Sequence, residues 1–335
     1  MNFVKPKGSD PFKNDDSVHW SLPEHRVFTL AHLSDFHLFS PNQAGMGTLL
    51  NKRAYGYISW RFHRTLEHND QVVSALLEDV KLTRPDHMVL TGDLTHLGLP
   101  SEFLKAQELI RSLGTPSQVT VIPGNHDTYV DTPWDHTFHH WSEYMSSDED
   151  CTIRGEVKDL QSLFPILRLR NGIALIGVST ARPTPWFSAV GSIGKMQMER
   201  LEKMLNETRR RGLLRIIAIH HPPVPGAISW RKRLTDLDEL RSLLVRQGAE
   251  LLLHGHTHRI FFGHLDTPFG SIPSIGVPSA SSLGRIAERR ARYHLLHLIK
   301  GPDGLDLLLS ARVYSPSLKR FFHESEQRLA LPRPN

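Results

Sequence analysis

Residues 119–127 read Val-Thr-Val-Ile-Pro-Gly-Asn-His-Asp, an apolar run that ends in a turn carrying an amide, an imidazole and a carboxylate. The turn is ambiguous by itself, because Gly, Asn and Asp are the residues that any tight turn recruits to reach left-handed backbone angles. A buried strand with polar groups at its carboxyl end is also how sites are built on parallel sheets. The neighbouring segments decide between a plain turn and a site.

Two upstream segments repeat this arrangement. The apolar run 27–33 is followed by Asp35 and His37, and residues 87–91 run into Gly92 and Asp93. If the backbone stays extended after the first run, Asp35 and His37 project to the same face and could bind one ion. Three strand ends would then carry polar groups.

Helical patterns separate these three strands. Asn69 or Asp70 can cap a helix to Leu82, and Ser101 is expected to cap a second helix over 102–113. The resulting β-α-β-α-β order predicts parallel strands joined by right-handed crossovers, with a site outside the carboxyl edge of the sheet.

The second half of the chain begins with the hairpin signal Asn171-Gly172 between two apolar runs. A buried strand at 213–219 ends in His220-His221-Pro222-Pro223, and the run 251–253 leads into residues 255–258, Gly-His-Thr-His. Helices are expected over 195–211 and from a capping box at Thr235 and Asp238 to Arg246. Antiparallel strands are expected at 259–265, 293–299 and 305–313, and a loose segment after Phe322.

The composition favours one large domain. With 335 residues, 39% hydrophobic residues and no run of eighteen apolar positions, the chain can bury a core but not span a bilayer. We expect a polar tail over 1–26, a domain over 27–315 with insertions at 41–64 and 129–160, and a tail over 316–335. The adjacent His139 and His140 in the second insertion are interpreted as surface or packing residues.

The charge and the single cysteine bear on partners and compartment. A net charge of +5 suits an anionic partner, but the basic residues are spread along the chain without a concentrated groove, so no nucleic acid is expected as a partner. The start of the chain does not read as a secretory signal, and the lone Cys151 fits a reducing compartment. We expect a cytoplasmic protein.

The stretch 41–64 departs from the α/β pattern, because basic and aromatic residues alternate through its second half. One interpretation is a short helix packed over the body, since Leu50, Ala54, Tyr57 and Ile58 share one helical face. The other is a lid that touches an acyl-bearing substrate or a lipid surface. Residues 52–64 would then form a peripheral contact with the inner face of the membrane.

Taken in order, the strand-end groups resemble the calcineurin-like metallophosphoesterase family over residues 28 to about 263. The matching blocks are Asp35-Phe36-His37, Gly92-Asp93, Gly124-Asn125-His126-Asp127, His220 with His221-Pro222, and Gly255-His256-Thr257-His258. Any one block is weak evidence, whereas five in order are specific. The resemblance implies an α/β (α+β) fold, a four-layer α-β-β-α sandwich of two mixed sheets with a dimetal site at the carboxyl ends of the strands.

The resemblance also implies roles for the site residues. Asp93 would bridge two divalent ions, with iron, manganese and zinc all compatible with ligands that include no thiolate. One ion would be completed by Asp35, His37 and His258, and the other by Asn125, His220 and His256. His220 is chosen over His221, which would lie beside the prolines or contact substrate.

In the same family, a hydroxide held between the ions attacks phosphorus in line. His126 would stabilise the charge that develops on the phosphate or protonate the leaving oxygen, and Asp127 would orient His126. The first expectation for the reaction is hydrolysis of a small phosphodiester, similar to a cyclic nucleotide.

Two other functions fit parts of the sequence. The basic aromatic stretch 52–64 is similar to that of lipid-associated members that cleave UDP-2,3-diacylglucosamine at its pyrophosphate. A non-catalytic metal-binding adaptor is also possible in this fold. The presence of every expected ligand and of His126 weighs against the adaptor.

Overall fold

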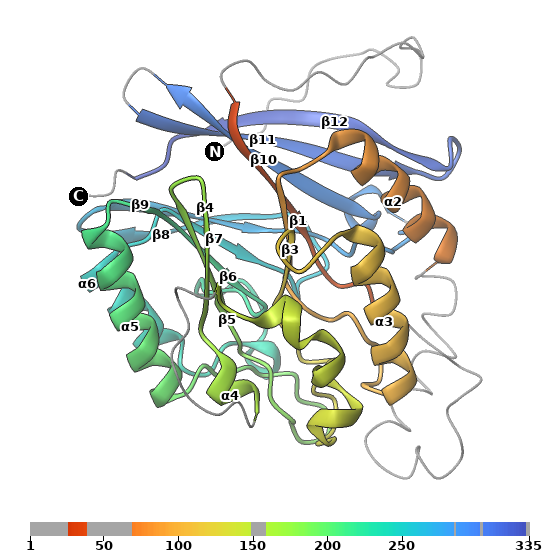
Figure 1. Ribbon diagram of the computed structural model, residues 1–335, viewed down its shortest axis with the longest axis horizontal. Coiled ribbons are helices and arrows are strands. Elements are labelled where there is room, and N and C mark those ends of the chain that lie inside the picture. Colours follow the sequence, from red (N-terminus) through yellow and green to blue (C-terminus); the bar gives the residue numbers. More distant parts are fainter. Residues whose placement is uncertain (1–25, 39–68, 149–158, 285, 302–303, 333–335) are drawn as a thin grey trace.

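The computed structural model describes residues 26–38, 69–148, 159–284, 286–301 and 304–332 (Figure 1). The interpretations of residues 1–25, of the stretch 41–64 and of Cys151 therefore lie outside the described residues. Within them, twelve strands form two six-stranded sheets. None of the described helices is long and apolar enough to cross a membrane.

The first sheet has the strand order β12-β11-β10-β1-β2-β3. Its strands are β1 (Arg26–Leu33), β2 (His87–Leu90), β3 (Val119–Val121), β10 (Arg292–Gly301), β11 (Gly304–Ser315) and β12 (Arg320–Leu329). The β1, β2 and β3 strands are parallel, as predicted, and the other three pair antiparallel. The parallel strands are connected through α2 (Asp70–Thr83) and α3 (Pro100–Leu113).

The starts of these two helices differ in how well they were predicted. The Asn69 side chain accepts a hydrogen bond from the backbone N–H of Gln71, which confirms the cap of α2. The predicted cap of α3 at Ser101 is wrong. The helix begins two residues earlier than predicted, at Pro100, whose missing N–H and fixed φ suit the first helical position, and Leu99 occupies the N-cap position. The Glu102 carboxylate instead accepts from the backbone N–H groups of Leu97 and Leu99.

The second sheet has the order β4-β5-β6-β7-β9-β8. Its strands are β4 (Ile166–Arg170), β5 (Ile173–Val178), β6 (Leu214–Ile219), β7 (Leu251–His254), β8 (Phe261–Thr267) and β9 (Gly270–Gly276). The predicted β4–β5 hairpin is confirmed, and its turn has positive φ at both Asn171 (46°) and Gly172 (82°). The β9 strand was not predicted from the sequence.

Two helices, α5 (Lys195–Arg210) and α6 (Leu237–Gln247), lie on the outer side of this second sheet (Figure 1). The predicted capping box at Thr235 and Asp238 is wrong, because Asp236 occupies the N-cap position. Its carboxylate accepts from the backbone N–H groups of Ile193 and Gly194 in another loop. A tertiary contact thus replaces the local cap.

Alternation along the central strands divides the apolar residues between two cores. In β6, Ile216 and Ala218 join the core that also contains β1, β2 and the α2 and α3 helices, while Ile217 and Ile219 join the core under α5 and α6. A strand with both faces buried reads as a continuous apolar run for this reason. With α2 and α3 on one flank and α5 and α6 on the other, the predicted four-layer sandwich is confirmed.

The carboxyl-terminal segment is part of the first sheet. The prediction of a loose segment after Phe322 is wrong, since β12 pairs antiparallel with β11 up to Leu329. The β12 strand escaped prediction because most of its side chains are exposed and charged or polar, so it lacks an apolar pattern. The folded unit therefore extends beyond residue 315.

Four buried histidines lie in the strands of the first sheet. They are His32, His87, His294 and His297. Burial holds the pKa of each imidazole below its usual value, to about 3 for His87 and His294, to about 4 for His297 and well below 6.5 for His32. These rings are therefore neutral in the folded protein at moderately acidic pH.

We expect the free energy of unfolding to fall as the pH drops from 6.5 towards 4. The unfolded chain protonates these imidazoles near pH 6.5 whereas the folded chain does not, so each ring contributes a slope of about 1.4 kcal/mol per pH unit. Urea unfolding at a series of pH values measures this slope. His87→Gln should reduce it, and a matched change at the exposed His264 of β8 should not. An unchanged slope in His87→Gln would contradict the assignment.

Candidate metal centre

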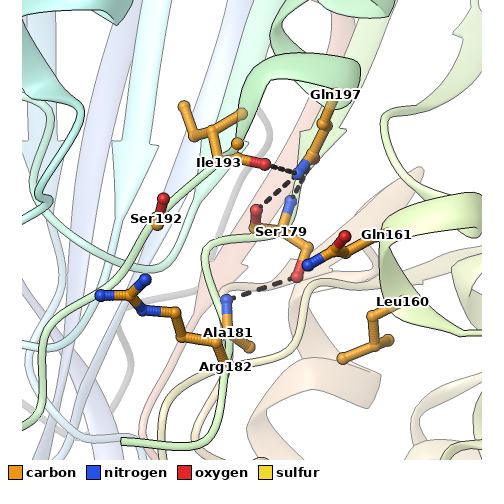
Figure 2. A pocket seen from close by; sticks show the side chains of 9 residues that line it. Leu160, Gln161, Ser179, Ala181, Arg182, Ser192, Ile193 and Gln197 are labelled. Atoms are coloured by element: carbon orange, nitrogen blue, oxygen red, sulfur yellow. Dashed lines mark hydrogen bonds between the residues drawn. The ribbon is translucent and has the colours of Figure 1, made fainter.

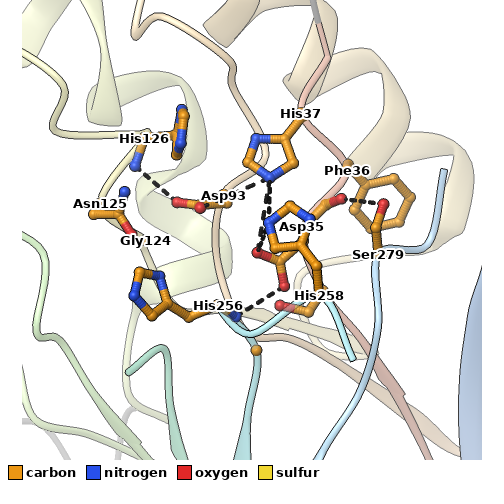
Figure 3. Close-up of polar contacts among 12 residues, drawn as sticks. Asp35, Phe36, His37, Asp93, Gly124, Asn125, His126, His256, His258 and Ser279 are labelled. Atoms are coloured by element: carbon orange, nitrogen blue, oxygen red, sulfur yellow. Dashed lines mark hydrogen bonds and ion pairs between the residues drawn. The ribbon is translucent and has the colours of Figure 1, made fainter. Parts of the chain in front are cut away.

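The seven predicted metal ligands gather at one edge of the sandwich, where the carboxyl ends of strands from both sheets meet, and Figure 3 labels all of them except His220. Asp35 and His37 follow β1, Asp93 follows β2, Asn125 follows β3, His220 follows β6, and His256 and His258 follow β7. The sequence order of the five blocks is thus brought together in space. The ligand roles remain proposals, which the geometry below supports.

The backbone at five of these seven residues is left-handed rather than extended. The φ angles are 55° at Asp35, 47° at His37, 54° at Asp93, 66° at His256 and 52° at His258. The expectation that an extended backbone brings Asp35 and His37 to one face is therefore wrong. These five are among nine non-glycine residues with positive φ in the described chain. Each such residue costs roughly 1–2 kcal/mol, and this strain concentrates at functional sites.

Neighbouring segments hold the strained loop after β1 in place. The backbone N–H of Asp35 donates to the carbonyl of Gly92 (2.9 Å), and that of His37 donates to the carbonyl of Asp93 (2.9 Å). The hydroxyl of Ser279 donates to the carbonyl of Asp35 (2.7 Å; Figure 3). Sequence reasoning missed Ser279, because it lies far along the chain and carries no metal-ligating group.

The first group of ligands surrounds His37. Its Nε2 lies 3.1 Å from Nε2 of His258, 3.8 Å from Oδ1 of Asp35 and 3.8 Å from Oδ2 of Asp93. The Oδ1 atom of Asp35 also lies 3.3 Å from His258 Nε2. These are the distances at which ligand atoms surround a common ion.

The second group surrounds His220 and shares Asp93 with the first. The Nε2 atom of His220 lies 3.4 Å from Oδ2 of Asp93 and 3.1 Å from Oδ1 of Asn125, and His256 lies within the same group. Because the other oxygen of Asp93 accepts from the backbone N–H of His126 (2.7 Å), Oδ2 alone faces both groups.

Backbone carbonyls fix which nitrogen of each ring faces the site. His220 Nδ1 lies 2.6 Å from the carbonyl of Thr91, and His256 Nε2 lies 2.9 Å from the carbonyl of Lys232. A carbonyl only accepts, so the nitrogen beside it carries the proton and the opposite nitrogen presents a lone pair. Carbonyls are the usual outer partners of metal-ligating histidines.

The adjacent His221 is held differently. Its Nδ1 lies 2.7 Å from the hydroxyl of Thr180 and its Nε2 lies 3.0 Å from the carbonyl of Ala189. Both ring nitrogens are thus engaged, so of the two adjacent imidazoles only His220 presents a nitrogen to the ligand group. Burial lowers the pKa of His221 to about 3, and His220 adds to this shift.

The segment that holds His221 is itself anchored by helix α5. Gln197 lines a small pocket, whose side chains Figure 2 shows and whose volume is about 70 Å³. The Gln197 amide accepts from the backbone N–H of Ser179 (2.9 Å) and donates to its carbonyl (2.8 Å). These bonds pair the backbone N–H and carbonyl of Ser179, the residue after β5, and thereby place Thr180 against His221.

Asp127 does not have the expected role of orienting His126. Its two oxygens accept from the backbone N–H groups of Asp93 (3.0 Å), Thr95 (2.9 Å) and Gly124 (2.8 Å). It therefore ties the loop after β2 to the loop after β3. Burial and the neighbouring Asp93 carboxylate raise the pKa of Asp127 to about 7.

The imidazole of His126 is oriented by a backbone group instead. Its Nδ1 lies 2.6 Å from the carbonyl of His96, so Nδ1 donates and Nε2 carries the lone pair. The His126 ring packs edge-on against His37, with centroids 4.6 Å apart. His96 was not predicted, although its own ring lies within ligand distance of His37 and His126. The sequence feature that could have identified His96 is its position three residues after Asp93, in the loop that follows β2.

The charges in the centre are strongly coupled. Burial opposes ionisation of Asp93, but His220, His126 and His256 outweigh it and hold the pKa of Asp93 well below its usual range. The same contact with Asp93 outweighs burial at His220 and raises its pKa to about 9. A buried carboxylate at this point is therefore kept negative by its neighbours.

The residues present fit divalent cations. The Oδ1 atom of Asp35 is fully buried and has no hydrogen-bond partner in the described part of the chain. Leaving a buried charged oxygen without a partner is costly unless a cation satisfies it. Imidazole, carboxylate and amide ligands without thiolate suit iron, manganese or zinc.

Gly124 leaves no room for a side chain. A Cβ atom there would lie 2.3 Å from Oδ1 of Asp93 and 2.8 Å from Cε1 of His220. We expect Gly124→Ala to displace both residues and to lower the content of bound metal at least about tenfold. Elemental analysis of purified protein loaded with Mn²⁺ measures this.

Gly212→Ala is the matched control for that change. Gly212 has a φ of 63°, but no atom lies within 4 Å of the position that a Cβ atom would take, so the substitution adds backbone strain without a clash at the site. It should retain metal while losing about 1 kcal/mol of stability. Full metal occupancy in Gly124→Ala would contradict the tight fit.

The fold is that of known dimetal phosphatases. A crystal structure of a dimetal phosphatase from Danio rerio superposes with a TM-score of 0.59, at 12% sequence identity, over 89% of this chain and 98% of the other. The profile of the calcineurin-like phosphoesterase family matches residues 28–259. The chain belongs to this family.

Several curated proteins are similar in sequence. A probable glycerophosphodiester phosphodiesterase from Arcobacter nitrofigilis is 28% identical over 53% of this chain and 58% of its own length. A cAMP/cGMP dual specificity phosphodiesterase from Mycobacterium tuberculosis is 23% identical over 69% of this chain and 62% of its own length. A probable cyclic nucleotide phosphodiesterase from Synechococcus is 24% identical over 83% of this chain and 89% of its own length. The chain spans about three fifths of the length of the first two.

Proposed function

We propose that the protein is a metal-dependent phosphodiesterase that hydrolyses a small phosphodiester similar to a cyclic nucleotide. The observation that carries this proposal is the position of Asp93 Oδ2, 3.8 Å from Nε2 of His37 and 3.4 Å from Nε2 of His220. A single buried carboxylate oxygen thus faces two ligand groups. Two divalent ions bound there would supply the positive charge that neutralises a phosphate and acidifies a water molecule.

In this proposal the ligands divide as the two groups do. Asp35, His37 and His258 hold one ion, and Asn125, His220 and His256 hold the other. Asp93 serves both. The carbonyls of Thr91 and Lys232 orient the rings of His220 and His256 so that their opposite nitrogens face the site, where an ion would displace any proton they carry.

His126 is the candidate for direct contact with the phosphate. Because its Nδ1 donates to the carbonyl of His96, protonation at Nε2 makes the ring a donor towards the site. It can then stabilise the charge that develops on the phosphate or transfer a proton to the leaving oxygen. Asp127 supports this indirectly by holding the two loops together.

The substrate class rests on the family and on the names of the relatives. These include cyclic nucleotide and glycerophosphodiester phosphodiesterases, which act on small phosphodiesters. Cyclic nucleotides, glycerophosphodiesters, phosphate monoesters and UDP-2,3-diacylglucosamine should each be assayed with Mn²⁺, Fe²⁺ and Zn²⁺. We expect the highest kcat/KM for a diester. Turnover restricted to monoesters, or to the lipid-linked pyrophosphate, would contradict the proposal.

A further inference from the structure

A second, larger pocket is lined by residues between Pro222 and Asp238, in the segment that follows His220 and His221. It has a volume of about 350 Å³, which is within the range of sites that hold small molecules. Its apolar walls are Pro222, Val224, Ile228, Trp230, Leu234 and Leu237. The described ligands of the metal centre do not include any of these residues, so the pocket is additional to that centre.

The walls of this pocket are joined to the histidines of the centre. Pro222 directly follows His221, and the carbonyl of Lys232 accepts from Nε2 of His256. The next residue, Arg233, accepts at its carbonyl from the backbone N–H of Gly191 (3.1 Å), in the segment that also supplies Ala189 to His221. The lining of the pocket is therefore tied by chain adjacency and hydrogen bonds to His221 and His256.

The pocket offers one aromatic surface. Trp230 is 69% exposed, so its indole ring is accessible to a ligand. The guanidinium of Arg231 stacks on the Trp230 ring at 5.0 Å, so the indole is partly oriented before a ligand arrives. Indole rings bind flat heteroaromatic groups by stacking.

Polar groups stand among these apolar walls. Arg233 supplies hydrogen-bond donors, Asp238 supplies acceptors, and the hydroxyl of Thr235 can accept while it donates to the carbonyl of Gly191. Apolar faces with a few polar groups match a nucleobase, whose faces are apolar and whose edge carries donors and acceptors. A glycerol group, which is small and polar all round, would gain little from such walls.

We propose that this pocket, built around Trp230, binds the nucleobase of a nucleotide diester whose phosphate lies at the metal centre. The inference rests on the proposed phosphodiesterase function and assigns the residues that would recognise the base of its substrate. Trp230 and Arg233 then determine specificity, whereas the metal ligands and His126 act on the phosphate alone.

The test compares two substrates that share one scissile group, 3′,5′-cyclic AMP and ribose 3′,5′-cyclic phosphate, which lacks the base. In Trp230→Ala we expect the ratio of kcat/KM for the nucleotide to that for the abasic compound to fall about 5- to 100-fold, the range that stacking of one base provides. Trp230→Phe should restore most of the ratio. Trp186→Ala is the matched control, since Trp186 is 53% exposed and does not line the pocket.

Binding of AMP, measured by calorimetry with Mn²⁺-loaded protein, separates the two proposals. If no diester is hydrolysed but AMP binds and Trp230→Ala weakens its binding, the proposed reaction is wrong and the base pocket stands. If diesters are hydrolysed but Trp230→Ala changes neither the ratio nor AMP binding, the base pocket is wrong and the reaction stands. Equal losses with the nucleotide and the abasic compound would also overturn the pocket.

Discussion

Asp93→Asn is expected to remove bound metal and activity together, with a fall in kcat/KM on the order of 10³-fold. The substitution keeps the shape of the side chain but removes its charge. A neutral amide cannot provide the single negative oxygen that faces both His37 and His220, and its NH₂ group can turn towards the ions. Metal content by elemental analysis and turnover of a phosphodiester should therefore fall in parallel.

The control for this change is Asp306→Asn. Asp306 pairs with Arg328 on the first sheet, and the same loss of charge there should affect neither metal content nor turnover. Unfolding curves of both variants show whether the fold is retained. Wild-type metal occupancy in a folded Asp93→Asn variant would remove Asp93 from its proposed bridging position.

His126→Ala is expected to leave metal content unchanged and to lower turnover by about 10² to 10⁴-fold, the usual contribution of a positioned acid or base. The imidazole packs against His37 but hydrogen-bonds to a backbone carbonyl, so its removal takes no ligand from the two groups. Metal content and kcat measured on the same preparation give the contrast with Asp93→Asn.

His139→Ala provides the comparison for His126. His139 is an exposed histidine in the 3₁₀ helix over Phe138–Met145, and its loss should change neither metal content nor turnover. A substrate with a better leaving group should be less sensitive to His126→Ala if the ring protonates the leaving oxygen. Full activity in His126→Ala would refute its assigned role.

The predictions that succeeded rest on local pattern. Apolar runs followed by Asp35, Asp93 and His256 mark strand ends, and parallel strands place their carboxyl ends at one edge whatever the detailed packing. The Asn171-Gly172 turn was predictable for a similar reason, since both residues tolerate positive φ. Residue type and order were enough in these cases.

The predictions that failed depend on contacts between distant residues. The carbonyls of His96 and Lys232 orient His126 and His256, yet a carbonyl is present at every residue and leaves no mark on the sequence. The resemblance implied that Asp127 orients His126, whereas its oxygens accept hydrogen bonds from backbone groups of the loop after β2. The left-handed angle at Asp35 likewise depends on its bonding partners across the fold.

The metal centre draws on both sheets, and this bears on the order in which the protein matures. One ligand group joins Asp35, His37 and Asp93 from the first sheet to His258 from the second, and the other joins Asp93 to His220 and His256. The first sheet is itself completed only by β10, β11 and β12 at the end of the chain. A chain that lacks β10, β11 and β12 would carry the proposed ligands without the complete first sheet that aligns them, so we expect metal to bind only after these strands have docked.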